Sequence, residues 1–222
     1  MPLPKDNLLY GFADKLTDEQ REYVDAIAEY QFVGVNAPAG TGKTSLAVMT
    51  SRALGRDVLY IFSPIQEGRM GFLPGTLEDK EAPYITPLID ALLEMGEDPM
   101  RVLYKEDNID NIKRGNCWVR AISHVHARGI NIKGTEDRPL AVIIDEAANF
   151  TRGELKKVLT RIHQDVKVIM IGHDNQCDLE DVSKSGFVPY LEHFENQPYF
   201  KRCYLTHNHR GKISQHADKL SW

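Results

Sequence analysis

The sequence predicts a three-layer α/β domain with a mainly parallel central sheet, because short apolar runs alternate with helical patterns along the chain. Four of these runs are almost continuously apolar, which is typical of parallel strands covered by helices on both faces. The four predicted strands lie at residues 32–35, 58–62, 140–144 and 166–171. No internal repeat or low-complexity tract interrupts the alternation.

The clearest predicted helix covers residues 151–162. Thr151 and Glu154 have the spacing of a capping box, in which two side chains satisfy backbone groups at a helix start. Apolar residues then recur at positions that share one helix face, so this helix is expected to pack against the sheet.

Composition excludes several classes of protein. The chain has 222 residues, is 42% hydrophobic and carries a net charge of −5, so it is expected to be globular and is no polybasic binder of nucleic acid. No apolar run approaches the roughly 20 residues of a membrane helix. The three cysteines are dispersed and no secretory signal is visible at the N-terminus. These features predict a cytoplasmic protein with no membrane partner.

We expect residues 1–222 to form one domain, with an insertion at about 64–115 and a basic segment at about 200–222. The insertion is acidic and rich in proline, and it is expected to carry a helix near 84–95. The C-terminal segment contains five basic residues and three histidines against one aspartate. Such a polarised charge distribution is compatible with local binding of a polyanion, although solvated charged faces give the same pattern.

A glycine-rich loop follows the first predicted strand and precedes a helical pattern. In this context glycines allow backbone N–H groups to surround phosphate oxygens, and the helix N-terminus contributes positive potential. The residues predicted to bind a nucleotide here are Ala39, Gly40, Thr41, Gly42, Lys43, Thr44 and Ser45. Lys43 is expected to reach the β and γ phosphates, and the Thr44 hydroxyl to join a Mg²⁺ shell. Ala37 stands where the usual motif has its first glycine, which an ordinary backbone conformation tolerates.

Two further strand ends carry polar residues. Asp145 and Glu146 follow the strand at 140–144, and Gln176 follows the strand at 166–171. Because the carboxyl ends of parallel strands meet at one edge of a sheet, these residues are expected to lie near the glycine-rich loop. We expect Asp145 to hold Mg²⁺, Glu146 to polarise an attacking water and Gln176 to contact water and the γ-phosphate. The fold class is therefore expected to be that of a RecA-like P-loop NTPase that uses ATP.

Together these motifs resemble the PhoH family of P-loop ATPases, whose core is similar to the first motor domain of superfamily 1 helicases. The resemblance covers residues 17–215 in order and spacing. It rests on segments 37–44, 71–75, 83–92, 127–129, 143–149, 159–162 and 172–178. The chain departs from the family pattern at Ala148, which replaces a glutamine, and at His173, which replaces an aspartate.

The resemblance implies roles for residues that the motifs alone do not assign. Gln20 is similar to the glutamine that reads adenine ahead of the phosphate loop, and Arg210 is similar to a late arginine that faces the γ-phosphate. The family includes hexamers, so we expect a homo-oligomeric ring in which an arginine completes a neighbour's site. Arg210 and Arg128 are the two candidates for that arginine.

The expected function is hydrolysis of ATP with Mg²⁺, coupled to binding or remodelling of RNA or single-stranded DNA. The nucleic-acid part follows from the resemblance. Two alternatives remain open. One is an ATP-driven switch or assembly protein that acts on a protein partner. The other is a P-loop kinase, although an acidic pair with a nearby glutamine favours water as the phosphoryl acceptor.

Overall fold

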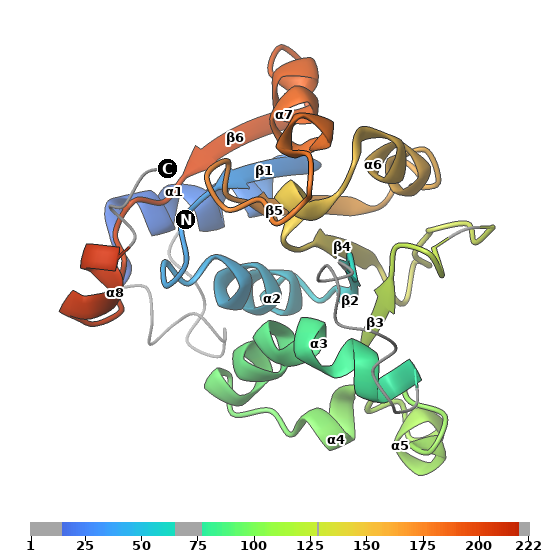
Figure 1. The fold of residues 1–222 in the computed structure, drawn as a ribbon. Coiled ribbons are helices and arrows are strands. Elements are labelled where there is room, and N and C mark those ends of the chain that lie inside the picture. The colour runs from blue at the N-terminus through green and yellow to red at the C-terminus, as the bar shows by residue number, and fades with distance from the viewer. Residues whose placement is uncertain (1–14, 65–76, 128, 218–222) are drawn as a thin grey trace.

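The computed structural model describes residues 15–64, 77–127 and 129–217 and contains a six-stranded sheet in which every strand pair is parallel (Figure 1). The order across the sheet is β3-β2-β4-β5-β1-β6. The strands are β1 Phe32–Asn36, β2 Asp57–Phe62, β3 Val119–Ser123, β4 Leu140–Ile144, β5 Lys167–Gly172 and β6 Phe200–Tyr204. The predicted α/β class with a parallel sheet is confirmed.

The four apolar runs form β1, β2, β4 and β5, each within one residue of its predicted limits. The edge strands β3 and β6 were not predicted, because charged residues such as Arg120 and Lys201 interrupt their apolar character. An edge strand pairs on one side only, so a partly exposed, partly charged pattern is what this position allows.

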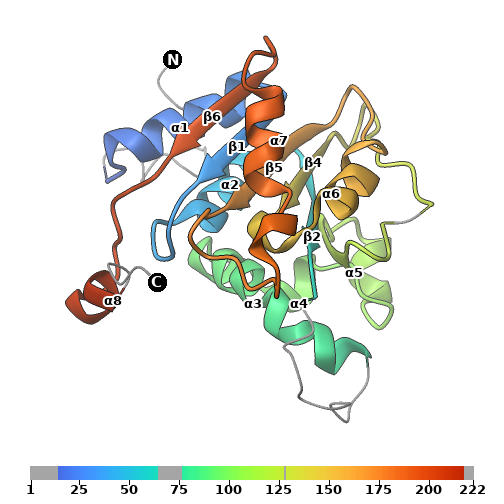
Figure 2. The same ribbon diagram turned by 45° about the horizontal axis from the view of Figure 1, so that its top comes forward.

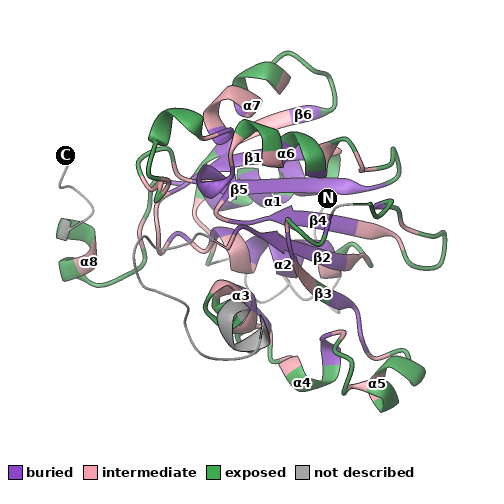
Figure 3. Ribbon diagram, turned by 45° about the vertical axis from the view of Figure 1, so that its right-hand side comes forward, coloured by how far each residue is buried: buried purple, intermediate pink, exposed green. Residues whose placement is uncertain are grey.

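The helices of the described residues are α1 Asp18–Glu29, α2 Lys43–Ala53, α3 Leu77–Glu94, α4 Pro99–Val102, α5 Ile109–Lys113, α6 Arg152–Leu159, α7 Phe187–Phe194 and α8 Lys212–Ala217, with short 3₁₀ turns η1 Ala147–Asn149 and η2 Val182–Lys184. Helices α1, α2 and α3 cover one face of the sheet and α6 and α7 cover the other. Neighbouring strand residues point to opposite faces. Val58 and Ile143 pack with α1, α2 and α3, whereas Leu59 and Val142 pack with α6 and α7. Figure 3 shows the buried strands between these partly exposed helices.

Helix α6 begins as the sequence predicts and ends earlier. The Thr151 side chain accepts a hydrogen bond from the Glu154 backbone, and the Glu154 side chain accepts one from the Thr151 backbone. The helix stops at Leu159 rather than at residue 162. Helix α1 starts with a second capping box, which is formed by Thr17 and Gln20.

Helix α3 is longer than the predicted 84–95 and continues through Pro83 and Pro87. Proline inside a helix removes a backbone donor and is locally unfavourable. Tertiary packing compensates here, because Leu88 and Leu92 are fully buried against the core that α1 and α2 share. Helix α3, which lies within the predicted insertion, is therefore built into one layer of the domain.

The carboxyl ends of β1, β4 and β5 lie at one edge of the sheet, since these strands are parallel and β5 pairs with both others. The chain reaches the same edge again after β6, where an extended segment leads to α8 (Figure 2). In Figures 1 and 2, α8 stands apart from the layers of the domain. Within the described ranges, no helix is long and apolar enough to span a membrane.

Replacing Leu92 by alanine is expected to lower the free energy of unfolding by about 2–5 kcal/mol, because a cavity replaces a buried side chain. Leu93, on the same helix, is 58% exposed and provides the matched control. Its replacement by alanine should change stability by no more than about 0.5 kcal/mol. Denaturant unfolding of both variants measures the difference, and equal effects would contradict the packing of α3.

Candidate active site

The glycine-rich loop lies between β1 and α2 and turns through two left-handed residues, Gly40 with φ 78° and Gly42 with φ 79°. A side chain at either position would strain the backbone. Among the residues that the structure describes, only Glu146 combines a side chain with a positive φ, so Ala37 keeps an ordinary conformation. The Ala37 amide donates to the Gly172 carbonyl over 2.9 Å, which ties the loop to the end of β5.

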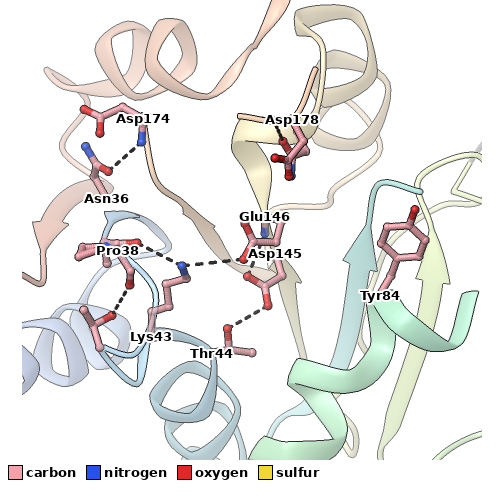
Figure 4. A network of polar contacts seen from close by, with 12 residues as sticks. Asn36, Pro38, Lys43, Thr44, Tyr84, Asp145, Glu146, Asp174 and Asp178 are labelled. Atoms are coloured by element: carbon pink, nitrogen blue, oxygen red, sulfur yellow. Dashed lines mark hydrogen bonds and ion pairs between the residues drawn. The ribbon is translucent and has the colours of Figure 1, made fainter. Parts of the chain in front are cut away.

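Lys43 opens α2 and its side chain bends back over the loop (Figure 4). The ammonium group donates a hydrogen bond to the Ala37 carbonyl over 3.1 Å and lies 3.9 Å from Glu146 Oε1. Lys43 is only 7% exposed. A buried cation that bridges the loop and a carboxylate is well placed to meet an anionic ligand.

Asp145 follows β4 and is 1% exposed. Its Oδ2 atom accepts hydrogen bonds from the Thr44 hydroxyl over 2.9 Å and from the Tyr60 hydroxyl over 2.8 Å. Its Oδ1 atom accepts one from the Glu146 amide over 2.9 Å. Three donors from three parts of the chain hold this carboxylate in place, which compensates for its burial.

Hydroxyl and carboxylate oxygens are the ligands that Mg²⁺ prefers, and the Thr44 and Asp145 oxygens are already hydrogen-bonded to each other. The donor set therefore fits a magnesium ion. Away from this pair, the described residues contain no group of three or more His, Cys, Asp or Glu side chains placed to hold a metal.

Glu146 adopts a left-handed backbone conformation with φ 49°, which is unusual for a residue with a side chain and often marks functional sites. Its side chain is 45% exposed. Although the side chain as a whole is partly exposed, the surrounding protein displaces water from the carboxyl and so raises the pKa of Glu146; Lys43 opposes that rise, and the nearby Asp145 and Asp178 carboxylates add to it. Glu146 thus sits beside the loop with an increased tendency to hold a proton.

The segment after β5 completes the sheet edge. The Asp174 amide donates to Oδ1 of Asn36 over 3.2 Å, which joins this segment to β1. Asn149 and Asp178 exchange two hydrogen bonds, of 2.8 and 3.2 Å, which join it to the turn after β4. Gln176 lies between these two connections in the sequence.

A cavity of about 930 Å³ opens beside the acidic pair, and Asp145, Glu146 and Gln176 all line it. Its other acidic lining residues are Glu154, Asp178, Glu180 and Asp181. No residue of the loop at 37–44 lines this cavity. Because carboxylates repel phosphate, this cavity is less suited to an anion than the loop beside it.

The opposite side of the loop is covered by α1 and the segment after β6. The Gln20 Nε2 atom donates to the Thr41 carbonyl over 2.9 Å and lies 3.1 Å from His209 Nε2. The His209 amide donates to the Gly40 carbonyl over 2.8 Å. A Cβ atom at Gly40 would lie 2.7 Å from Cγ of Arg210, so the stem of this exposed arginine packs directly on the loop.

The structure therefore brings most of the predicted site residues to one sheet edge. Gln20 and Arg210 lie on one side of the loop, and Glu146 and Gln176 lie on the other. The candidate Arg128 lies outside the described residues. Two residues that contact this site were not predicted, Tyr60 and His209. A tyrosine within a buried apolar strand needs a hydrogen-bond partner for its hydroxyl, so the sequence could have indicated that Tyr60 contacts a polar group of the site.

A family model described as "PhoH-like protein" matches residues 13–217. The PhoH-like protein of Synechocystis sp. is 37% identical over 196 residues, which cover 86% of this chain and 56% of that protein. Protein PhoH of Escherichia coli (strain K12) is 30% identical over 185 residues, which cover 80% of this chain and 49% of that protein. The chain spans about half the length of these relatives.

Among solved structures, the helicase domain of Hef from Pyrococcus furiosus aligns with a TM-score of 0.51 at 13% identity, covering 94% of this chain and 40% of that chain. At this identity the likeness concerns the fold alone. The family match extends over most of the sequence, from the helix before the loop to the segment that covers it. This chain belongs to the PhoH-like family.

Proposed function

We propose that this chain is a Mg²⁺-dependent ATPase. The family and the helicase-type fold together suggest a nucleotide-binding NTPase. One observation carries the proposal further: Lys43, the Thr44–Asp145 pair and Glu146 converge within hydrogen-bonding or ion-pair distance at the carboxyl edge of the sheet. Figure 4 shows these side chains converging from the start of α2 and from the end of β4.

The phosphates are bound by backbone N–H groups of residues 39–44 at the start of α2, where the helix dipole favours negative charge. Lys43 exchanges its contact with the Ala37 carbonyl for the β and γ phosphates. Thr44 and Asp145 would hold the magnesium ion, which would supply positive charge to offset that of the phosphates.

Glu146 then acts as the general base. Its carboxylate accepts a proton from water as the water oxygen attacks the γ-phosphorus, and the bond between phosphorus and the bridging oxygen of ADP breaks. Gln176 orients that water, and Lys43 offsets the negative charge that develops on the transferred group. The left-handed backbone of Glu146 keeps its carboxylate next to the loop.

Negative charge that develops on the γ-phosphoryl group during transfer is commonly offset by an arginine. Arg210 packs on the loop of its own chain, and its exposed guanidinium is the first candidate. Arg128 is the candidate for action between subunits. We propose a head-to-tail ring, such as a hexamer, that places it at a neighbour's site. A strictly monomeric species with full activity in light scattering and hydrolysis assays would contradict the ring.

We propose RNA or single-stranded DNA as the polymer that this ATPase binds. The distribution of charge instead favours the alternative, an ATP-driven switch that acts on a protein partner. Two basic side chains of the C-terminal segment already form ion pairs within the protein. Lys201 pairs with Glu22 over 2.8 Å and Arg202 with Glu195 over 3.4 Å. The cavity beside Glu146 is lined by carboxylates. These pairings reduce the positive potential available to a polyanion.

Steady-state ATP hydrolysis, measured alone and with single-stranded RNA or DNA, separates these functions. Stimulation by one polymer supports the nucleic-acid-coupled ATPase and identifies its substrate class. Hydrolysis that ignores both polymers supports the switch. Absence of ATP binding and hydrolysis under all conditions would overturn the proposed function.

Lys43→Ala is expected to abolish hydrolysis, because the site loses its only described cation in contact with both the loop and Glu146. Loss of an essential electrostatic contact typically reduces kcat by about 10²–10³-fold. Lys157→Ala, which removes an exposed lysine on α6, is the matched control and should leave the rate unchanged. Phosphate release by the two variants provides the comparison, and an unaltered rate in Lys43→Ala would exclude the proposed role.

Glu146→Gln is expected to retain ATP binding and to slow turnover by about 10²–10⁴-fold, because the amide cannot accept the proton. Equilibrium binding of ATP and single-turnover hydrolysis measure the two effects separately. Near wild-type turnover would remove Glu146 as the general base.

The pH dependence of kcat/KM, which reports the pKa values of the free enzyme, offers an independent check on the same residue. Because the pKa of Glu146 is raised, this carboxyl stays protonated to a higher pH than an ordinary glutamate. Its base form is lost as the pH falls through that raised value, so the acid-side decline in kcat/KM should begin at a higher pH than for an unperturbed glutamate. A profile that stays flat through the pH range of an ordinary glutamate would contradict this expectation.

A further inference from the structure

We infer that Tyr60 is a positioning residue for the magnesium site, because its hydroxyl holds the Asp145 carboxylate in the orientation in which that side chain serves as a metal ligand. The inference rests on the proposed function and deepens it, since it concerns the metal site of the same ATPase. It gives a role to a residue in the middle of an apolar strand, outside the glycine-rich loop and the acidic pair.

Strand pairing places Tyr60 beside Asp145. In the ladder between β2 and β4, Tyr60 is paired with Ile143. The Asp145 amide continues this ladder by donating to the Ile61 carbonyl over 3.0 Å. Side chains two positions apart on a strand point to the same face, so Asp145 extends from β4 on the face that Tyr60 occupies on β2. The Tyr60 hydroxyl reaches Asp145 Oδ2 over 2.8 Å.

The single hydrogen of this hydroxyl belongs to the contact with Asp145. A second acceptor, the Tyr84 carbonyl on α3, lies 3.5 Å from the Tyr60 oxygen. A separation of 2.8 Å is typical of a hydrogen bond between two oxygens, whereas 3.5 Å is beyond the usual range. Tyr60 therefore donates to the carboxylate.

The three donors to Asp145 differ in their relation to the metal. Thr44 and Tyr60 both donate to Oδ2, and the Glu146 amide donates to Oδ1. The Thr44 hydroxyl is itself a proposed metal ligand, so it is not an independent restraint on the carboxylate. The bonds from Tyr60 and from the Glu146 amide act on different oxygens, and together they fix the rotation of the carboxylate about its Cβ–Cγ bond. Tyr60 supplies the restraint on Oδ2.

Packing holds the Tyr60 ring in place. Tyr60 is 1% exposed and belongs to the core that β2 shares with α1, α2 and α3. Its ring centroid lies 6.4 Å from that of Phe62, which in turn stacks on Tyr84 of α3 at 5.7 Å. A group whose rotamer is locked by packing orients a ligand more precisely than a group on a loop. The orientation of Asp145 is thus built into the core of the domain.

Loss of the Tyr60 hydroxyl should therefore affect metal binding and leave phosphate binding intact. Removing a group that orients a metal ligand typically reduces metal affinity by about 10–100-fold. The two residues that the hydroxyl approaches, Asp145 and Tyr84, both lie outside the loop at 37–44. Binding of a nucleotide without metal should not depend on this hydroxyl.

The test is equilibrium binding of an ATP analogue that resists hydrolysis, measured in EDTA and across a range of Mg²⁺ concentrations. Tyr60→Phe should raise the Mg²⁺ concentration at which binding is half-maximally tightened by about tenfold, and should leave the affinity in EDTA unchanged. Tyr23→Phe is the matched control, because Tyr23 is also fully buried and its hydroxyl donates to the Lys43 carbonyl over 3.3 Å. This control should keep the Mg²⁺ dependence of the wild type.

A double-mutant cycle with Asp145→Asn tests whether Tyr60 acts through Asp145. Once Asp145 is replaced, Tyr60→Phe should have no further effect on the Mg²⁺ dependence. A further increase in the double variant would overturn the inference. The comparison also covers the case in which Tyr60→Phe alone does not fold, because the double variant removes the buried charge together with its donor.

An unchanged Mg²⁺ dependence in folded Tyr60→Phe, with folding checked by thermal unfolding, would overturn the inference. An equal increase in Tyr23→Phe, or an equal loss of affinity in EDTA, would also overturn it, because either result would assign Tyr60 to general stability. A wild-type protein that does not bind the analogue, or whose binding Mg²⁺ does not tighten, would be a different failure. That result would overturn the proposed function itself, and this inference with it.

Discussion

The carboxylate of Asp145 is the contact on which the arrangement of the site depends. It accepts hydrogen bonds from Thr44 on α2, Tyr60 on β2 and the Glu146 amide, so one buried anion joins three elements at the sheet edge. Burial is the larger cause, and the nearby Asp145 carboxylate the smaller one, of a raised pKa of Tyr60. The Tyr60 hydroxyl therefore keeps its proton and donates a hydrogen bond to Asp145. Leaving such an anion without its donors would be costly, which makes the geometry specific.

A second constraint acts on the other side of the phosphate loop. The carbonyls of Gly40 and Thr41 are both turned outward, toward His209 and Gln20 respectively. Consecutive carbonyls that face away from the site leave the intervening amides free to face it. The first helix, which precedes the loop closely in sequence, and the segment after β6, which lies far from it in sequence, thus both shape the loop.

Much of the fold was predictable because a parallel sheet leaves a strong pattern of apolar runs. The edge strands were not predictable, since partial exposure permits residues such as Arg120 and Lys201. Helix α3 continues through Pro83 although proline disfavours a helix interior. The burial of Leu88 and Leu92 outweighs the loss of one backbone hydrogen-bond donor. In the site, the proximity of Asp145, Glu146 and Gln176 to the loop was predictable, because parallel strands end at the same edge of a sheet. The contact of Gln20 with His209 joins residues 189 positions apart, and such a contact leaves no local pattern in the sequence.

A structure of this chain with Mg²⁺ and an ATP analogue that resists hydrolysis tests the central claim most directly. The account predicts the triphosphate against the backbone amides of residues 39–44, with the metal bound next to Thr44 and Asp145. It also predicts Lys43 at the β and γ phosphates and Glu146 facing the γ-phosphorus. A nucleotide bound elsewhere, with the loop free of phosphate, would contradict the account.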